Sequence, residues 1–269
     1  WTRMDGPDDA IRTDAAQARL EDVPLGVKGP PGRHIDQGAL ALDANGGLLV
    51  GTFGAGLWRA AAPPLSIRSW SEQSAEGHRL RTEDVYAVHP DGAGGAWVGT
   101  FGGSVQHVLA DGRVRPLPLP KDAPQDLIDG VIDLDRTADG TLWAATSGGV
   151  YRFNPDTGAF RLYRHPNTAT AYSVALLHDR DGRLWVGTGG GGLMLYRPAS
   201  DDFRQFLPTQ DPRSLPGDFV TVLKQDRRGR LWVGTRSNGV GICTLRDARL
   251  DCDRVAGAHR DHGHRAHPH

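Results

Sequence analysis

A short pattern recurs five times along this chain of 269 residues, and it constrains the fold more than any other feature. Each copy has a glycine-containing turn, a short apolar run and a final threonine. The copies are NGGLLVGT at 45–52, GGAWVGT at 94–100, DGTLWAAT at 139–146, DGRLWVGT at 181–188 and RGRLWVGT at 228–235. The equivalent positions 49, 97, 143, 185 and 232 are 48, 46, 42 and 47 residues apart. That period is typical of one four-stranded propeller blade.

The units also divide internally into four predicted strands. In the fourth unit the strands are expected at 172–178, 184–188, 193–196 and 203–206, and in the third at 131–134, 142–146, 150–153 and 160–163. Asp-Gly and Pro-containing turns separate these runs, as expected for hairpins. The only helix-like stretch is 14–21. The sequence therefore predicts an all-β protein, a β-propeller with four-stranded antiparallel blades.

The repeated Trp and the Gly-Thr pair are best explained by architecture. A blade buries little apolar surface alone, so a large side chain must contact the next blade. Glycine allows strands to approach closely. Two units depart from the pattern, because Leu49 replaces the Trp and Ala145 replaces the Gly. Both changes are compatible with the same packing.

Composition excludes several classes of protein. The formal net charge is -1, without the basic surplus of a nucleic-acid-binding protein. No run of 18 apolar residues is present, which argues against a transmembrane helix in this chain. No signal-peptide pattern precedes the repeats, and the chain starts at Trp1. We expect the sequence to be a piece of a longer protein.

The repeat DGRLWVGTGGGGLMLYRPASDDFRQF, preceded by YSVALLHDR, closely resembles the two-component regulator propeller repeat. The resemblance extends over about 35–250. It implies a periplasmic sensor region of a hybrid histidine kinase or diguanylate cyclase, from a seven-bladed propeller. We therefore expect an incomplete ring or arc of five to six blades at 35–250, after a lead at 1–34 and before a His-rich tail at 251–269. Residues 1–4 are a candidate outer strand of a preceding blade.

Other motifs carry weaker signals. Residues 187–192 satisfy G-x-G-x-x-G, but a strand pattern follows where a nucleotide site needs a helix. Asp133, Asp135 and Asp139 faintly resemble a calcium loop, although Thr137 breaks the pattern. We expect no cofactor, no metal site and no catalytic residue.

The cysteines and the tail leave alternatives open. Cys243 and Cys252 flank a predicted hairpin, where opposite residues can reach disulfide distance; two buried thiols are the alternative. The tail at 258–269 holds five histidines. It is interpreted as a disordered end or as non-native sequence from a frameshift, with transition-metal binding as the other reading.

Ligand contacts are expected on one face of the propeller. The loops before the first strand and after the second strand of each blade emerge together around the central channel, and loops on a rigid scaffold commonly carry function. The candidate residues in these loops are Phe53, Asp84, Phe101, Asp129, Tyr172, Asp218, Phe219, Arg236 and Asn238. The aromatic rings could stack on a sugar, with packing as the alternative role for each. The other residues offer hydrogen bonds or charge.

The sequence leaves three candidate functions open. The first is a periplasmic ligand-sensing module whose ligand is a small molecule or an oligosaccharide, as the resemblance implies. In the full receptor it could form a homodimer through the propeller, with membrane attachment through segments outside this chain and with no nucleic-acid partner. The second is a protein-interaction scaffold. The third is a propeller lyase or glycosidase, which would need acids or histidines with perturbed pKa values on the loop face.

Overall fold

A computed structural model describes residues 39–255, apart from 62–65, 103, 119–120, 122–123, 126–128 and 165–171. These residues form five four-stranded antiparallel sheets, each built from consecutive strands. The sheets are named here blades one to five in chain order. The all-β prediction is therefore confirmed.

The strand bounds follow the sequence repeat closely. Blade one contains β1 Leu40–Leu42, β2 Leu48–Thr52, β3 Gly56–Ala61 and β4 Ser66–Trp70; blade two contains β5 Val85–Pro90, β6 Ala96–Thr100, β7 Ser104–Val108 and β8 Val114–Pro116. Blade three contains β9 Val131–Arg136, β10 Leu142–Thr146, β11 Gly149–Phe153 and β12 Phe160–Tyr163. Blade four contains β13 Ser173–His178, β14 Leu184–Thr188, β15 Leu193–Arg197 and β16 Asp202–Phe206; blade five contains β17 Val220–Gln225, β18 Leu231–Thr235, β19 Val240–Arg246 and β20 Arg249–Arg254.

One predicted boundary is wrong. The blades were expected to end at 250, but β20 continues to Arg254. Cys252 is 1% exposed and pairs in register with Cys243, so residues 251–254 belong to the fifth sheet. The lead at 1–34, its helix-like stretch and the candidate strand at 1–4 lie outside the described residues, as does the tail at 258–269.

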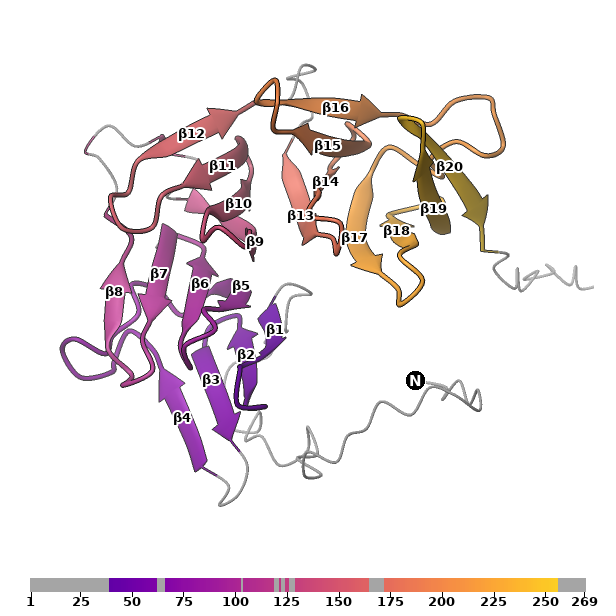
Figure 1. The fold of residues 1–269 in the computed structure, drawn as a ribbon. Helices are drawn as coiled ribbons and strands as arrows, with labels where there is room; N and C mark the ends of the chain where they lie inside the picture. Colours follow the sequence, from indigo (N-terminus) through magenta and orange to yellow (C-terminus); the bar gives the residue numbers. More distant parts are fainter. Residues whose placement is uncertain are drawn as a thin grey trace, which may run out of the picture.

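The five blades form an open arc (Figure 1). The first strand of each blade (β1, β5, β9, β13, β17) lies on the inner side of the arc, and the fourth strand lies on the outer side. Neighbouring first strands contact one another along the arc. This arrangement is that of a propeller seen along its axis, and the described blades do not close a ring.

Apolar cores lie between neighbouring blades, as the repeated Trp predicted. Trp97 packs against blade three, Trp143 against blade four and Trp185 against blade five. In blade one, Leu49 takes the same place, and Trp70 from β4 supplies additional bulk beside it. Each Trp among these three is no more than 6% exposed, so burying them contributes about 2–3 kcal/mol apiece.

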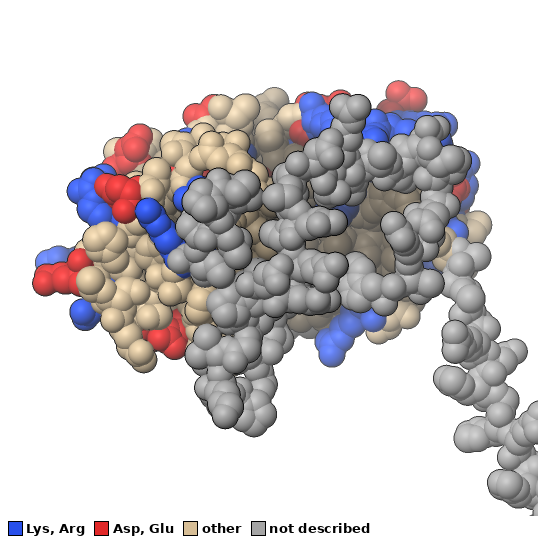
Figure 2. Space-filling model, turned by 90° about the horizontal axis from the view of Figure 1, so that it is seen from below, with Lys and Arg blue, Asp and Glu red and all other residues tan. Residues whose placement is uncertain are grey.

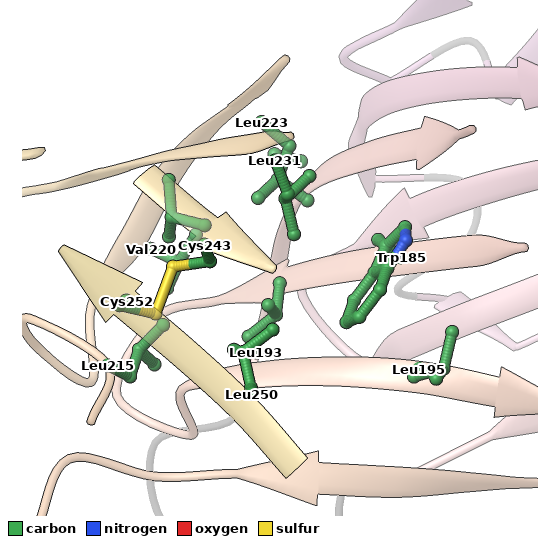
Figure 3. Close-up of a cluster of buried hydrophobic side chains, with 12 residues drawn as sticks. Trp185, Leu193, Leu195, Leu215, Val220, Leu223, Leu231, Cys243, Leu250 and Cys252 are labelled. Carbon is green, nitrogen blue, oxygen red and sulfur yellow. A yellow bond between two sulfur atoms is a disulfide. The ribbon is translucent and has the colours of Figure 1, made fainter. Parts of the chain in front are cut away.

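The interface between blades four and five also contains a disulfide (Figure 3). Cys243 and Cys252 are joined, with an S–S distance of 2.09 Å. They occupy directly opposite positions on β19 and β20. The connecting turn contains Asp247 and Ala248, both at positive φ, as a tight two-residue hairpin requires.

Candidate functional site

The threonine that ends each repeat motif fixes the loop after the second strand. In all five blades its hydroxyl donates a hydrogen bond to a carbonyl at the start of the third strand or just before it. The pairs are Thr52–Gly56, Thr100–Ser104, Thr146–Gly149, Thr188–Gly192 and Thr235–Gly239, at 2.9, 3.1, 3.1, 2.9 and 2.8 Å. These loops are therefore held in one conformation although they are rich in glycine.

In blades one, two and four, the same loops are also hydrogen-bonded to the next blade. The amide of Gly56 donates to the carbonyl of Glu83, and that of Gly102 donates to Asp129. The amides of Gly190 and Gly192 both donate to the carbonyl of Asp218. Each acceptor precedes the first strand of the following blade. The two sets of loops therefore form one continuous surface, named here the loop face.

Three aromatic rings gather on the loop face of blades one and two. Phe53 and Phe101 are 37% and 54% exposed, although both are large apolar side chains. Tyr86 lies between them, with ring centroids 6.2 Å from Phe53 and 6.3 Å from Phe101. Sequence reasoning missed Tyr86, because it lies within β5 rather than in a loop. Its signal is the alternation of β5, which turns Val85 inward to the blade interface and Tyr86 away from it.

A second group lies on blades four and five. Tyr172 and Phe219 meet edge to face, with centroids 5.6 Å apart. The Arg236 guanidinium lies 5.0 Å from the centre of the Phe219 ring, a cation–π geometry. Asn238 is exposed on the same loop, and its side chain packs against Gly217. This group joins an aromatic surface to a positive charge and an amide.

The predicted acids are placed less uniformly. Asp84 is half-buried, and its carbonyl accepts a bond from the amide of Phe101. Asp129 is exposed and accepts a side-chain bond from Gln125 at 2.7 Å. Asp218 is exposed beside the second aromatic group. The structure therefore assembles the nine candidates into two groups, on blades one to three and on blades four and five.

Asp133 and Asp135 have a structural role in place of the faint calcium pattern. Their carboxylates accept bonds from the amides of Leu176 and His178 on β13, at 2.7 and 2.5 Å. They thus join the inner strands of blades three and four. Burial raises the pKa of Asp133 to about 7. Among the described residues, no group of three or more His, Cys, Asp or Glu could hold a metal ion.

The remaining sequence motifs are structural. Residues 187–192 pass from β14 into β15, so the glycine run joins two strands. Within the described part of the chain, no helix has the length and apolarity needed to cross a membrane. Figure 2 shows both basic and acidic side chains among the coloured atoms, in keeping with the net charge of -1.

The sheets and loop face define this chain as a repeat protein of the β-propeller class. Residues 168–190 and 214–237 match the family described as two component regulator propeller. Two segments in blades four and five thus match this family model, and the resemblance seen in the sequence is confirmed. A comparison with curated proteins gives no match.

Solved structures share the fold at low sequence identity. The extracellular domain of a putative one component system from B. thetaiotaomicron has a TM-score of 0.63 and 20% identity, covering 77% of this chain and 27% of that one. That of a putative hybrid two component system from the same organism gives 0.62 and 20%, covering 78% and 27%. This chain thus spans less than a third of either domain. Virginiamycin B lyase from Staphylococcus aureus gives 0.62 and 13%, covering 84% and 74%.

Proposed function

We propose that this chain is the extracytoplasmic ligand-sensing propeller module of a bacterial two-component-type receptor, and that a glycan or its breakdown product binds on the loop face. The observation that carries the proposal is the exposure of Phe53 and Phe101 on loops held rigid by threonine bonds and by bonds between blades. Exposed aromatic rings on a fixed scaffold offer flat apolar surfaces to sugar rings.

The second aromatic group gives the same surface a polar component. Arg236 and Asn238 are exposed beside Phe219 and Tyr172. Ligand sites combine apolar walls with a few polar groups that fix orientation. A ligand that touches both groups would link blades at the two ends of the arc. Its differential affinity for two arrangements of the receptor would supply the signal.

The comparisons support this choice of class. Two of the similar folds are extracellular domains of signalling systems, and the family model is named for such regulators. We therefore propose that the chain lies outside the cytoplasm, in a receptor that forms a homodimer through the propeller and whose kinase or cyclase output and membrane segment lie outside this chain. We propose binding without catalysis for this chain, with a protein-interaction scaffold as the alternative.

The experiment is a thermal-shift and calorimetric screen of neutral and acidic oligosaccharides against the full chain. We expect at least one to raise the melting temperature, and Phe101→Ala with Arg236→Ala to weaken its binding about tenfold or more. Leu42→Ala is the matched control, since Leu42 is an exposed apolar residue at the edge of blade one opposite to the loop after β2. Unchanged affinity in the double variant would disprove the proposed site. Turnover of a glycan would support the lyase or glycosidase alternative.

A further inference from the structure

A hollow of about 1010 Å³ lies between blades two and three, away from the loop face. One wall is a row of paired residues across blade two: Trp97, His107 and Arg115. The other wall is on blade three and includes Arg136, Phe153 and Phe160. This hollow is named here the rim groove. Its size is at the upper end of the range for small-molecule sites.

The repeat departs from its usual pattern in the two blades beside the rim groove. In blades four and five, an arginine in the turn after the first strand folds back onto an aspartate: Arg183 onto Asp179 and Arg230 onto Asp226. The equivalent turn position in blade two is Gly95 and that in blade three is Thr141. Both replacements are small. The side chain over the tryptophan comes here from the third strand instead: His107 stacks on Trp97 at 3.9 Å, and Arg152 lies 5.9 Å from the centre of the Trp143 ring.

A buried donor is also left without a partner. Trp185 and Trp232 donate their indole N–H to the turn aspartate, at 2.8 and 3.1 Å. In blade two, the corresponding Oδ2 of Asp91 is hydrogen-bonded to Nε2 of His107 instead, at 2.8 Å. Among the described residues, the indole Nε1 of Trp97 then has no hydrogen-bond partner, although Trp97 is only 6% exposed. A buried N–H without a hydrogen-bond partner is unfavourable, and an acceptor atom of a ligand would supply that partner.

The charge of the groove is carried by four arginines. Arg152 and Arg161 bond the carboxylate of Asp201 on blade four. Among the described residues, Arg136 donates only to backbone carbonyls, those of Gly140 and Asp91. Arg115 is exposed and forms no ion pair with a described residue. Two guanidinium groups on opposite walls therefore lack a carboxylate partner in the described part of the chain.

Two of the three acids that line the groove, Asp91 and Asp139, are already hydrogen-bonded, whereas the third, Asp156, is exposed and forms no ion pair with a described residue. Asp91 pairs with His107, and its other oxygen accepts the amides of Ala93 and Gly95. Asp139 accepts bonds from Thr137 and Thr141 within its own turn. Guanidinium groups bind carboxylates through paired, charge-assisted hydrogen bonds. Two guanidinium groups without a carboxylate partner outnumber the one open carboxylate, and this balance favours an oxyanion ligand.

We propose that the rim groove binds a polycarboxylate, with one carboxylate held by Arg115, a second by Arg136, and an acceptor atom at the Trp97 N–H. Phe160 and the prolines of the rim provide the apolar wall for its carbon skeleton. A free polycarboxylic acid and a chain of uronic acids both have this chemistry. The site is separate from the loop face and does not depend on the sensory function proposed above.

Calorimetric titration of the full chain with citrate and with a short oligogalacturonate tests the proposal, with a neutral maltooligosaccharide as the ligand control. We expect at least one acidic probe to bind, with affinity falling as salt rises. Arg115→Gln should weaken binding about tenfold or more. Arg136→Lys, which keeps the charge but loses the planar fork, should weaken it less than Arg136→Gln. Citrate binding identifies a free acid as the ligand, and binding of oligogalacturonate alone identifies a uronate chain.

Two further variants distinguish binding in the rim groove from binding on the loop face. Arg228→Gln removes an exposed arginine in the turn of blade five and should leave binding unchanged. Phe101→Ala with Arg236→Ala alters the loop face and should also leave it unchanged. The proposal is overturned if neither acidic probe binds, or if Arg115→Gln and Arg136→Gln bind like the wild type while their melting temperatures show that they fold.

Discussion

Val85, the first residue of β5, fills the space that Gly51 leaves in the preceding blade. A Cβ atom on residue 51 would lie 2.4 Å from Cγ1 of Val85, which is closer than packed carbon atoms approach. The same relationship joins Gly99 to Val131 and Gly187 to Val220, at 2.6 and 2.8 Å. The glycine of the Gly-Thr pair therefore leaves a small gap, named here the socket, which the valine of the next blade fills.

The departure at Ala145 obeys the same rule. The residue of blade four that corresponds to Val85, Val131 and Val220 is Ser173, as the strand register shows. A larger residue in the socket is thus matched by a smaller residue opposite. The pair keeps the volume of the interface nearly constant, as close-packed interiors require.

Gly99→Ala should therefore destabilise the chain by about 1–3 kcal/mol through overpacking against Val131. Adding Val131→Ser, which copies the Ala145–Ser173 pair, should recover part of that loss. Denaturant unfolding of both single variants and the double variant measures the coupling, which we expect to be about 1 kcal/mol. Purely additive effects would show that the two residues do not share the socket.

Gly234→Ala provides the matched control for that experiment. Residue 234 has the same place in the repeat, but the atoms nearest to a Cβ there belong to Val222 of its own blade, the first at 3.3 Å. No valine of a following blade lies against it among the described residues. The substitution should therefore change the free energy of unfolding by less than Gly99→Ala does.

Asp179 should be one of the most sensitive surface-turn positions, because its side chain is almost fully buried. Its carboxylate accepts bonds from the amides of Asp181 and Arg183, the Arg183 guanidinium and the Trp185 indole. Burial alone would raise the pKa of Asp179, but these bonds outweigh it and the pKa lies below its usual value. Asp179→Ala should cost about 2–4 kcal/mol in thermal or denaturant unfolding.

Asp181→Ala is the control in the same turn. The Asp181 carboxylate is exposed and pairs only with Arg183. Exposed ion pairs contribute little, so the loss should stay within about 1 kcal/mol. A similar cost for both variants would mean that the network around Trp185 does not anchor the blade.

The repeat, the strands and the blade interfaces could be predicted from the sequence, because the period recurs and four of the five copies have a Trp at the same position. The sequence could not show the Gly99–Val131 contact, since the two residues are far apart in the chain and neither is unusual alone. It also missed Tyr86 and the rim groove. Both depend on which face of a strand is turned outward and on how adjacent blades differ, which a comparison of aligned repeats only partly reveals.

Asp133 should make stability depend on pH. Because its pKa in the folded chain is about 7, above the 3.8 of an ordinary aspartate, the folded state holds the proton more tightly. The contribution of Asp133 to the free energy of unfolding is therefore fully present below about pH 4, and it is lost as pH rises through 7. Burial lowers the pKa of His89, and that effect opposes the trend at the acidic end.

Comparing wild type with Asp133→Asn isolates the Asp133 contribution, since His89 is present in both. The asparagine variant loses one hydrogen-bond acceptor and should be less stable than the wild type. When stability is plotted against pH for both proteins, the difference between them should narrow as pH rises from 4 to 8. Denaturant midpoints across this range are the measurement. Parallel curves would show that Asp133 is ionised throughout.

The disulfide should stabilise blade five, the last described blade of the arc. Cys243 and Cys252 are 9 residues apart and both no more than 1% exposed, so the bond closes a short hairpin in a packed core. Chain-entropy estimates for a loop of this length give about 2–3 kcal/mol. Dithiothreitol should therefore lower the melting temperature of the wild type. The double variant Cys243→Ala with Cys252→Ala should melt at the lower temperature with or without it. A wild-type melting curve that does not respond to the reductant, although thiol titration shows complete reduction, would mean that packing alone holds β19 and β20 together.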